Sequence, residues 1–245
     1  MTWIYLSPHL DDAAFSCGGL IWQQVQAGED VEIWTICAGS PPEGELPPFA
    51  QSLHQRWGTG PETVAQRRVE DEQAAGKLGV KPRWFKIPDC IYRCDPQTGK
   101  PLYTSGAAIF GNLHPADKDL LSELSDTLAV ELPADARVVA PLTIGNHVDH
   151  QLVRQAADTL SQPLSIYADF PYIVNNGHLI AYRLPAGAKS QQYQLSEEEL
   201  AAWQDAVASY TSQLSTFWSD EAEMRQALQD YVSQNRGLQL WQRTQ

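Results

Sequence analysis

Short apolar runs alternate with segments of helical periodicity along most of the chain. Runs of β-prone residues bounded by glycine, proline or polar turn residues are typical of buried strands, whereas apolar positions three and four apart are typical of helices. This pattern predicts strands over 3–6, 31–38, 83–87, 137–142, 164–168 and 178–183. It predicts helices over 13–27, 61–78, 116–131, 149–160, 197–215 and 220–234.

The order of these segments predicts an α/β fold. Strand, helix and strand follow one another from the N-terminus, which is the order that builds a parallel sheet with helices on its faces. We therefore expect one domain over residues 1–245, with a mostly parallel sheet flanked by helices and a helical C-terminal region. Ser196, three residues before Glu199, predicts a capping box where that helical region begins.

Two turn-rich stretches, 39–61 and 89–115, interrupt the alternation. The first is too long for a plain connector, and stretches of that length often serve as lids or binding loops, so we expect it to border the functional site. The second has little periodicity and holds Cys90 and Cys94, the one close pair among four cysteines. Because no second pair lies nearby, ordinary reduced thiols are favoured over a structural zinc site.

The composition indicates a globular protein with a substantial core, because 43% of the 245 residues are hydrophobic and 19% are charged. Thirty acidic residues against 17 basic ones give a net charge of −13, and no dense basic run is present. This balance argues against nucleic acid and against a polyanionic membrane surface as partners. No signal peptide and no apolar stretch of about 20 residues is seen, so we expect a cytoplasmic protein without stable membrane insertion.

Two short motifs combine histidine with aspartate, and each follows a predicted strand and opens a predicted helix. The first is His9-Leu10-Asp11-Asp12, and the second is His147-Val148-Asp149-His150. In an open α/β sheet, ligands bind beyond the carboxyl ends of the strands, so both motifs can face one crevice. A catalytic zinc takes three ligands from His, Asp or Glu and leaves a position for water. Together the motifs predict a metal-dependent hydrolytic site.

Each motif also has a structural interpretation. Asp11 and Asp12 could cap a helix, since carboxylates at a helix start accept hydrogen bonds from free N–H groups. Asp149 could be an N-cap of its own helix, and His147 and His150 could be surface histidines of a polar loop. These roles are compatible with catalysis, because a capping carboxylate can also orient a neighbouring imidazole.

These residues strongly resemble the PIG-L/LmbE family of zinc-dependent de-N-acetylases. The first family signature, Ser/Ala-Pro-His-x-Asp-Asp followed by a glycine pair, matches 7–12 with Gly18 and Gly19. The second signature, His-x-Asp-His, matches 147–150. Arg67 to Glu70 looks like the Arg-x-x-Glu helix of the family.

The resemblance implies a Rossmann-like sheet of the LmbE-like type. It implies zinc ligation by His9, Asp12 and His150, with Asp11 as the general base for the hydrolytic water. Fe²⁺ or Mn²⁺ could replace Zn²⁺ in such a ligand set.

The resemblance also implies roles around the metal. His147 would act as general acid and stabilise the oxyanion, while Asp149 would hold the His147 imidazole in its donating orientation. Arg67 is a candidate contact for a substrate hydroxyl or phosphate, although an ion pair with Glu70 or another acid is an equal alternative. Tyr172 could present its phenol to the pocket, although an aromatic residue after a strand is more often part of the core.

Known relatives act on N-acetylglucosaminyl groups, so the expected function is hydrolytic removal of an N-acetyl group from an N-acetylglucosamine-type sugar or glycoconjugate. A metal hydrolase of the same fold that acts on another acyl amide or an ester is one alternative. A sugar- or nucleotide-binding α/β module is another, although the first strand leads to Asp11-Asp12 and not to Gly-x-Gly-x-x-Gly. The remaining histidines, His54, His114 and His178, are expected in loops or facing solvent.

Overall fold

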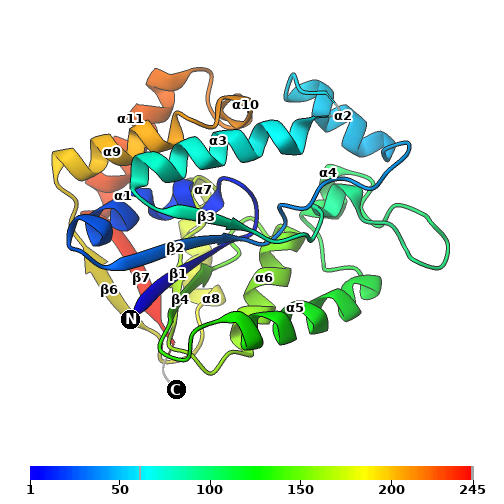
Figure 1. Cartoon of the computed structure of the whole chain (residues 1–245). Helices are drawn as coiled ribbons and strands as arrows, with labels where there is room; N and C mark the ends of the chain where they lie inside the picture. The colour runs from blue at the N-terminus through cyan, green and yellow to red at the C-terminus, as the bar shows by residue number, and fades with distance from the viewer. Residues whose placement is uncertain (61, 244–245) are drawn as a thin grey trace.

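The computed structural model describes residues 1–60 and 62–243. Within them, seven strands form one sheet in the order β3-β2-β1-β4-β5-β7-β6 (Figure 1). The strands are β1 (Thr2–Ser7), β2 (Asp30–Thr35), β3 (Lys81–Trp84), β4 (Arg137–Pro141), β5 (Leu164–Tyr167), β6 (Lys189–Tyr193) and β7 (Leu238–Gln242). Strands β1 to β5 are parallel, β7 is antiparallel to β5, and β6 is antiparallel to β7. The sheet is therefore mostly parallel, as predicted.

Helices cover both faces of this sheet. The longer helices are α1 (Asp12–Gln26), α2 (Pro48–Arg56), α3 (Thr63–Leu78), α5 (Lys118–Glu131), α6 (Val148–Asp158), α9 (Glu197–Val207) and α11 (Glu221–Asn235). The short ones are α4 (Gly106–Ile109), α7 (Ile173–Asn176), α8 (Ile180–Arg183), α10 (Thr211–Leu214) and the 3₁₀ turns η1 (Cys90–Tyr92), η2 (Pro115–Asp117) and η3 (Gly177–Leu179). In Figure 1, α3 and α9 lie along one face, and α5 and α6 along the other.

Alternation along β1 divides the core in two. Trp3 and Tyr5 join a cluster with α1, α3 and α9, whereas Ile4 and Leu6 join a second cluster with α5 and α6. Side chains of a strand point alternately to opposite faces, so a strand covered on both faces is apolar throughout. This explains why the first strand is a continuous apolar run and not an alternating one.

The glycine pair of the first motif lets α9 approach α1 closely. A Cβ atom on Gly18 would lie 2.4 Å from Cδ1 of Trp203, and one on Gly19 would lie 2.7 Å from Cδ1 of Leu195. The Trp203 indole N–H also donates to the Ala14 carbonyl oxygen at 2.8 Å. The glycines therefore fix the packing of the helix that carries Asp12.

Several predicted elements are confirmed with small shifts at their ends, including the strand at 3–6, the helix at 13–27 and the capping box of Ser196 with Glu199. The helix predicted over 61–78 begins at Thr63, and position 61 itself lies outside the described residues. The helix predicted over 197–215 is divided into α9 and α10. Among the described residues, no helix is both long and apolar enough to span a membrane.

The structure differs from the prediction in two places. The strand predicted over 178–183 is instead η3 and α8, whose residues are exposed or half-buried. The stretch 39–61 is more than a plain connector, as expected, and contains α2. Strands β6 and β7 were not predicted: β6 is a mostly exposed edge strand of polar composition, so it lacks the apolar alternation that identifies a strand.

Candidate active site

The two motifs meet at the switch point of the sheet. Strands β1 and β4 are parallel neighbours, β1 continues toward β2 on one side, and β4 continues toward β5 on the other. His9 to Asp12 follow β1, and His147 to His150 follow β4. Crevices at the carboxyl ends of such strands are where open α/β sheets bind ligands. The sequence-based placement of the site agrees with the structure.

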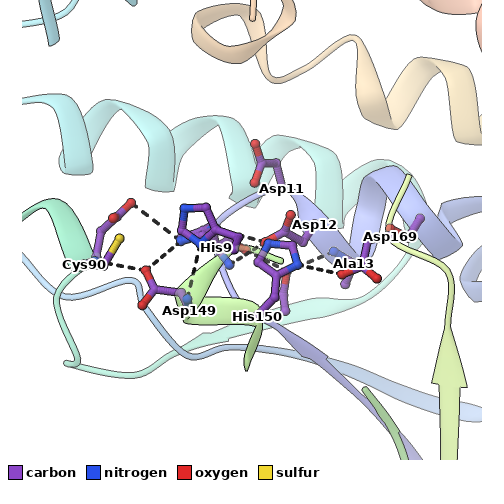
Figure 2. A network of polar contacts seen from close by, with 12 residues as sticks. His9, Asp11, Asp12, Ala13, Cys90, Asp149, His150 and Asp169 are labelled. Carbon is purple, nitrogen blue, oxygen red and sulfur yellow. Dashed lines mark hydrogen bonds and ion pairs between the residues drawn. The ribbon is translucent and has the colours of Figure 1, made fainter. Parts of the chain in front are cut away.

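One carboxylate oxygen lies between two imidazole rings (Figure 2). Oδ2 of Asp12 is 3.1 Å from Nδ1 of His9 and 3.3 Å from Nε2 of His150. The His9 backbone N–H also donates to this oxygen, at 2.8 Å. These two motifs therefore bring His9, Asp12 and His150 to one point, as the prediction for the three metal ligands requires.

The second nitrogen of each ring is held by another carboxylate. Nε2 of His9 is 3.0 Å from Oδ2 of Asp149, and Nδ1 of His150 is 2.6 Å from Oδ1 of Asp169. In a neutral imidazole, the nitrogen that donates its N–H to a carboxylate is protonated, so the other nitrogen has a free lone pair. Two such lone pairs and the Asp12 oxygen then converge, and this second carboxylate contact is typical of metal-binding histidines.

The distances from Asp12 and the electrostatics fit a cation. A tetrahedral metal with bonds of about 2.0–2.2 Å places its ligand atoms roughly 3.3–3.5 Å apart, close to the separations of Asp12 Oδ2 from the two rings. Ring nitrogens of His9, His147 and His150 also lie within 4.8 Å of one another, so His147 is a further candidate ligand. Burial lowers the pKa of His150, but the carboxylates of Asp12 and Asp169 raise it to about 10. The site thus favours a positive charge beside His150, which a metal ion can supply in place of a proton.

The role expected for Asp149 differs from the contacts it makes. Its carboxylate was expected to hold the His147 imidazole, but its oxygens contact His9 and the guanidinium of Arg93, the latter at 2.6 Å. The Cys90 backbone N–H donates to the same carboxylate at 2.9 Å. Asp149 therefore orients a predicted metal ligand, and only its backbone N–H reaches Nδ1 of His147, at 3.2 Å.

His147 is oriented by its loop. Because its Nδ1 accepts the N–H of Asp149, the neutral ring carries its hydrogen on Nε2, and the side chain lines the pocket. Burial and the neighbouring His9 hold the pKa of His147 well below its ordinary value. The preceding loop has positive φ at Thr143 (68°) and Asn146 (65°), a backbone conformation that needs support from surrounding contacts. Asn146 has that support, since its amide donates to backbone oxygens of the 89–115 stretch.

Asp11 is available for chemistry. Although it occupies the N-cap position of α1, its carboxylate makes no capping hydrogen bond there, so the capping interpretation does not account for it. It lines the pocket, and its closest cation is Arg67, with Nη2 at 3.6 Å from Oδ1. Burial raises the pKa of Asp11 to about 6, although the Arg67 guanidinium opposes this shift. A carboxylate in that range can exchange protons near neutral pH.

The pocket above these residues combines polar and aromatic walls. Both residues predicted to contact substrate, Arg67 and Tyr172, line it. Arg67 is not paired with Glu70, because that carboxylate accepts hydrogen bonds from Thr211 and Ser212. Its ion pair is with Asp11, so the alternative of an ion pair with another acid is confirmed, and contact with substrate stays a prediction. Leu53 and Trp57, at the end of the 39–61 stretch, complete the rim together with Ile91, Ile109, Phe110 and Phe217. The expectation that this stretch borders the site is confirmed.

The three remaining histidines lie apart from the ring cluster, whereas Cys90 lies beside it. His54 was expected in a loop or facing solvent but is buried in α2, with Nε2 2.6 Å from the Tyr92 hydroxyl. His114 lies half-buried in a loop and His178 is exposed, as expected. The two cysteines of the close pair separate: Cys94 is exposed, and Cys90 is buried with Sγ within 4.8 Å of ligand atoms of His147 and Asp149.

Two residues of the cluster were missed by the sequence analysis. Asp169 holds His150 and directly follows β5, so its place at the carboxyl edge of the sheet was a usable signal. Arg93 donates to Asp149 and lies in the 89–115 stretch. No pattern in the sequence around Arg93 indicates that it contacts either motif.

An open α/β sheet with a buried His-Asp cluster at its switch point is typical of proteins that bind a ligand at the carboxyl edge of the sheet. The chain belongs to the PIG-L family, described as GlcNAc-PI de-N-acetylase, whose family model matches residues 4–161. The predicted family and the predicted α/β fold are thereby confirmed.

The chain is also similar to individual deacetylases. It is 29% identical over 188 residues to the 2′-N-acetylparomamine deacetylase of Niallia circulans, covering 69% of this chain and 66% of that enzyme, just under two thirds of its length. Its structure resembles the zinc-inhibited form of teicoplanin deacetylase with a TM-score of 0.87 and 30% identity, over 99% of this chain and 97% of that one. It resembles the A40926 pseudoaglycone deacetylase with a TM-score of 0.72 and 26% identity, over 98% and 95%.

Proposed function

We propose that this protein is a zinc-dependent de-N-acetylase that hydrolyses the acetamide of an N-acetylated amino sugar or glycoconjugate. The observation that carries the proposal is the convergence of His9 and His150 on Oδ2 of Asp12, with each ring held from behind by a buried carboxylate. Family membership and the deacetylase relatives support the same chemistry.

His9, Asp12 and His150 would hold the metal. A zinc ion in such a site acts as a Lewis acid and makes water acidic enough to attack near neutral pH. The borderline-soft imidazoles and the single carboxylate suit Zn²⁺, and Fe²⁺ or Mn²⁺ are the alternatives that such donors accept.

Asp11 and His147 divide the proton chemistry. Asp11 takes a proton from the attacking water and passes it to the departing amine, so that the C–N bond breaks and acetate and an amine are released. His147 donates its Nε2–H to the oxygen that becomes negative as water adds to the carbonyl. This hydrogen bond suits the neutral form of His147 that burial favours, and its role as general acid stays a prediction.

The substrate is held by the pocket walls. Arg67 offers a cation beside Asp11, and Tyr172 and Phe110 flank the opening with aromatic faces on which a sugar ring can lie. Tyr172 is half-buried and packs against the core, but it also lines the pocket, so we propose it as a substrate contact as well. Aromatic faces with a few polar groups are typical of small-molecule sites.

Acetate release against a panel of substrates tests the proposal. The panel contains N-acetylglucosamine glycosides, N-acetylated aminoglycosides, N-acylated amino acids and O-acetyl sugars, each with and without a chelator. We expect acetate from N-acetylated sugars that stops when the metal is removed. Turnover confined to N-acyl amino acids or to O-acetyl sugars would identify the alternative hydrolases, and no turnover together with no bound metal would identify a binding module.

A further inference from the structure

Arg93 lies behind the metal site, in the stretch whose role the sequence leaves unassigned. Its side chain is 6% exposed and lies between two buried carboxylates. Nη1 is 2.6 Å from Oδ1 of Asp149, and Nη2 is 3.0 Å from Oδ2 of Asp117. The guanidinium thus connects the 89–117 segment to the second motif.

Asp117 is itself held in place. The Tyr103 hydroxyl donates to Oδ2 of Asp117 at 2.6 Å and accepts the His114 backbone N–H at 2.8 Å. Tyr103 and Asp117 are both buried. A planar guanidinium with two fixed acceptors has its orientation determined, which a single ammonium group cannot reproduce.

The orientation of Asp149 decides which nitrogen of His9 faces the metal. Oδ1 of Asp149 is taken by Arg93, which leaves Oδ2 to accept from Nε2 of His9 and from the Cys90 N–H. A second carboxylate, Asp89, lies 3.7 Å from the same His9 nitrogen and could draw the ring toward itself. A fixed Asp149 keeps Nδ1 of His9 directed at Asp12.

We propose that Arg93 is a positioning residue of the active site, which fixes Asp149 so that His9 presents Nδ1 as a metal ligand. This inference rests on the proposed function, because it assumes that His9 binds the metal. Burial raises the pKa of Asp149, but Arg93 and His9 lower it well below its ordinary value, in agreement with a permanently charged partner for Arg93.

The experiment compares full-length Arg93→Met, Arg93→Lys and Asp117→Asn with the wild type. Zn²⁺ affinity is measured by competition with a chromophoric chelator, on protein that circular dichroism has shown to be folded. The His9 tautomer is read from ¹⁵N NMR shifts of the imidazole in Zn²⁺-loaded protein, in which a ring bound to the metal through Nδ1 carries its hydrogen on Nε2. Arg93→Lys is included because Arg93→Met leaves two buried carboxylates without a cation and can prevent folding.

We expect Arg93→Met to weaken Zn²⁺ binding about 10–100-fold and Arg93→Lys about tenfold, the range found when a residue behind a metal ligand is lost. Both should reduce the Nε2–H tautomer of His9. Asp117→Asn keeps an acceptor for Arg93 but loses the ion pair, so it should weaken Zn²⁺ binding by a smaller factor than Arg93→Met.

The inference is overturned if a folded Arg93 variant, Arg93→Lys included, keeps both the wild-type Zn²⁺ affinity and the wild-type His9 tautomer. A merely structural role would lower thermal stability and leave these two readouts unchanged. If the wild type binds no zinc at all, the proposed function fails and the inference fails with it, an outcome distinct from unchanged variants of a zinc-binding wild type.

Discussion

The Asp149 carboxylate lies 3.0 Å from Nε2 of His9 and joins the two sequence motifs directly, across 140 positions of the chain. The second motif therefore supplies one proposed ligand, His150, and also the group that contacts a proposed ligand of the first motif. Neither motif would form the proposed metal site by itself.

Substitutions of the adjacent residues Asp11 and Asp12 should have different effects. Asp11→Asn should retain one zinc per chain and lose at least about 100-fold in kcat, because the base is removed and the ligands are not. Asp12→Asn should lose the metal, because its Oδ2 lies between His9 and His150. Metal analysis and acetate release on both variants check this. Parent-rate turnover by Asp11→Asn would show that the base is another group.

Asp169 should set zinc affinity through His150. Asp169→Asn weakens the 2.6 Å contact with Nδ1 of His150, so we expect Zn²⁺ to bind about 10–100-fold more weakly. Asp158→Asn is the matched control, since it removes the same charge from the exposed end of α6. The chelator competition assay measures both. Equal Zn²⁺ affinities for the two variants would show that Asp169 does not contribute to metal binding.

Gly18 should tolerate no side chain. Gly18→Ala places a Cβ 2.4 Å from the buried Trp203 ring, and we expect it to lower the free energy of unfolding by about 1–3 kcal/mol. Gly76→Ala, at an exposed position of α3 where a Cβ atom would meet nothing within 4 Å, should raise it by about 0.5–1 kcal/mol. Urea denaturation of the two variants distinguishes packing from helix propensity. A stabilised Gly18→Ala would contradict the close packing of α1 on α9.

Asp71 should make stability depend on pH. It is buried and accepts hydrogen bonds from Trp84 and Tyr210, and burial raises its pKa from 3.8 to about 7. Because the folded pKa is the higher one, the stabilisation from protonating Asp71 is complete below 3.8 and is lost as the pH rises to about 7.

Asp71→Asn removes this titration. The quantity to compare is the free energy of unfolding of the wild type minus that of the variant. We expect this difference to decrease as the pH rises from 4 to 7, by at most about 1.4 kcal/mol per pH unit, and to stay constant above pH 7. Urea denaturation at several pH values measures the difference. A difference that does not change with pH would mean that Asp71 is ionised throughout.

The sequence was sufficient for the parts of the fold that rest on local patterns. The strand at 3–6 is apolar throughout because it is covered on both faces, and the polar motif that follows it marks the carboxyl edge. The edge strand β6 has no such pattern, since Lys189 and the glutamines after it face solvent. Its pairing with β7 is a tertiary contact that no local periodicity records.

The site also has residues that the sequence predicts and residues that it does not. His9, Asp12 and His150 were predicted as metal ligands because they lie in short motifs at the starts of helices. Arg93 reaches Asp149 only through the folded path of an irregular segment, so its role depends on three-dimensional contacts. We expected the Asp149 carboxylate to contact His147, but it contacts His9. Spacing along the sequence cannot decide which of two nearby imidazoles a carboxylate contacts.

The central claim is that His9, Asp12 and His150 hold a catalytic metal. The most direct measurement is titration of metal-free protein with Zn²⁺ while acetate release from an N-acetylated amino sugar is followed. We predict that activity rises linearly and reaches its plateau at one zinc per chain, and that His150→Ala shows no such rise. Full acetate release by metal-free protein, or an unchanged titration in His150→Ala, would contradict the claim.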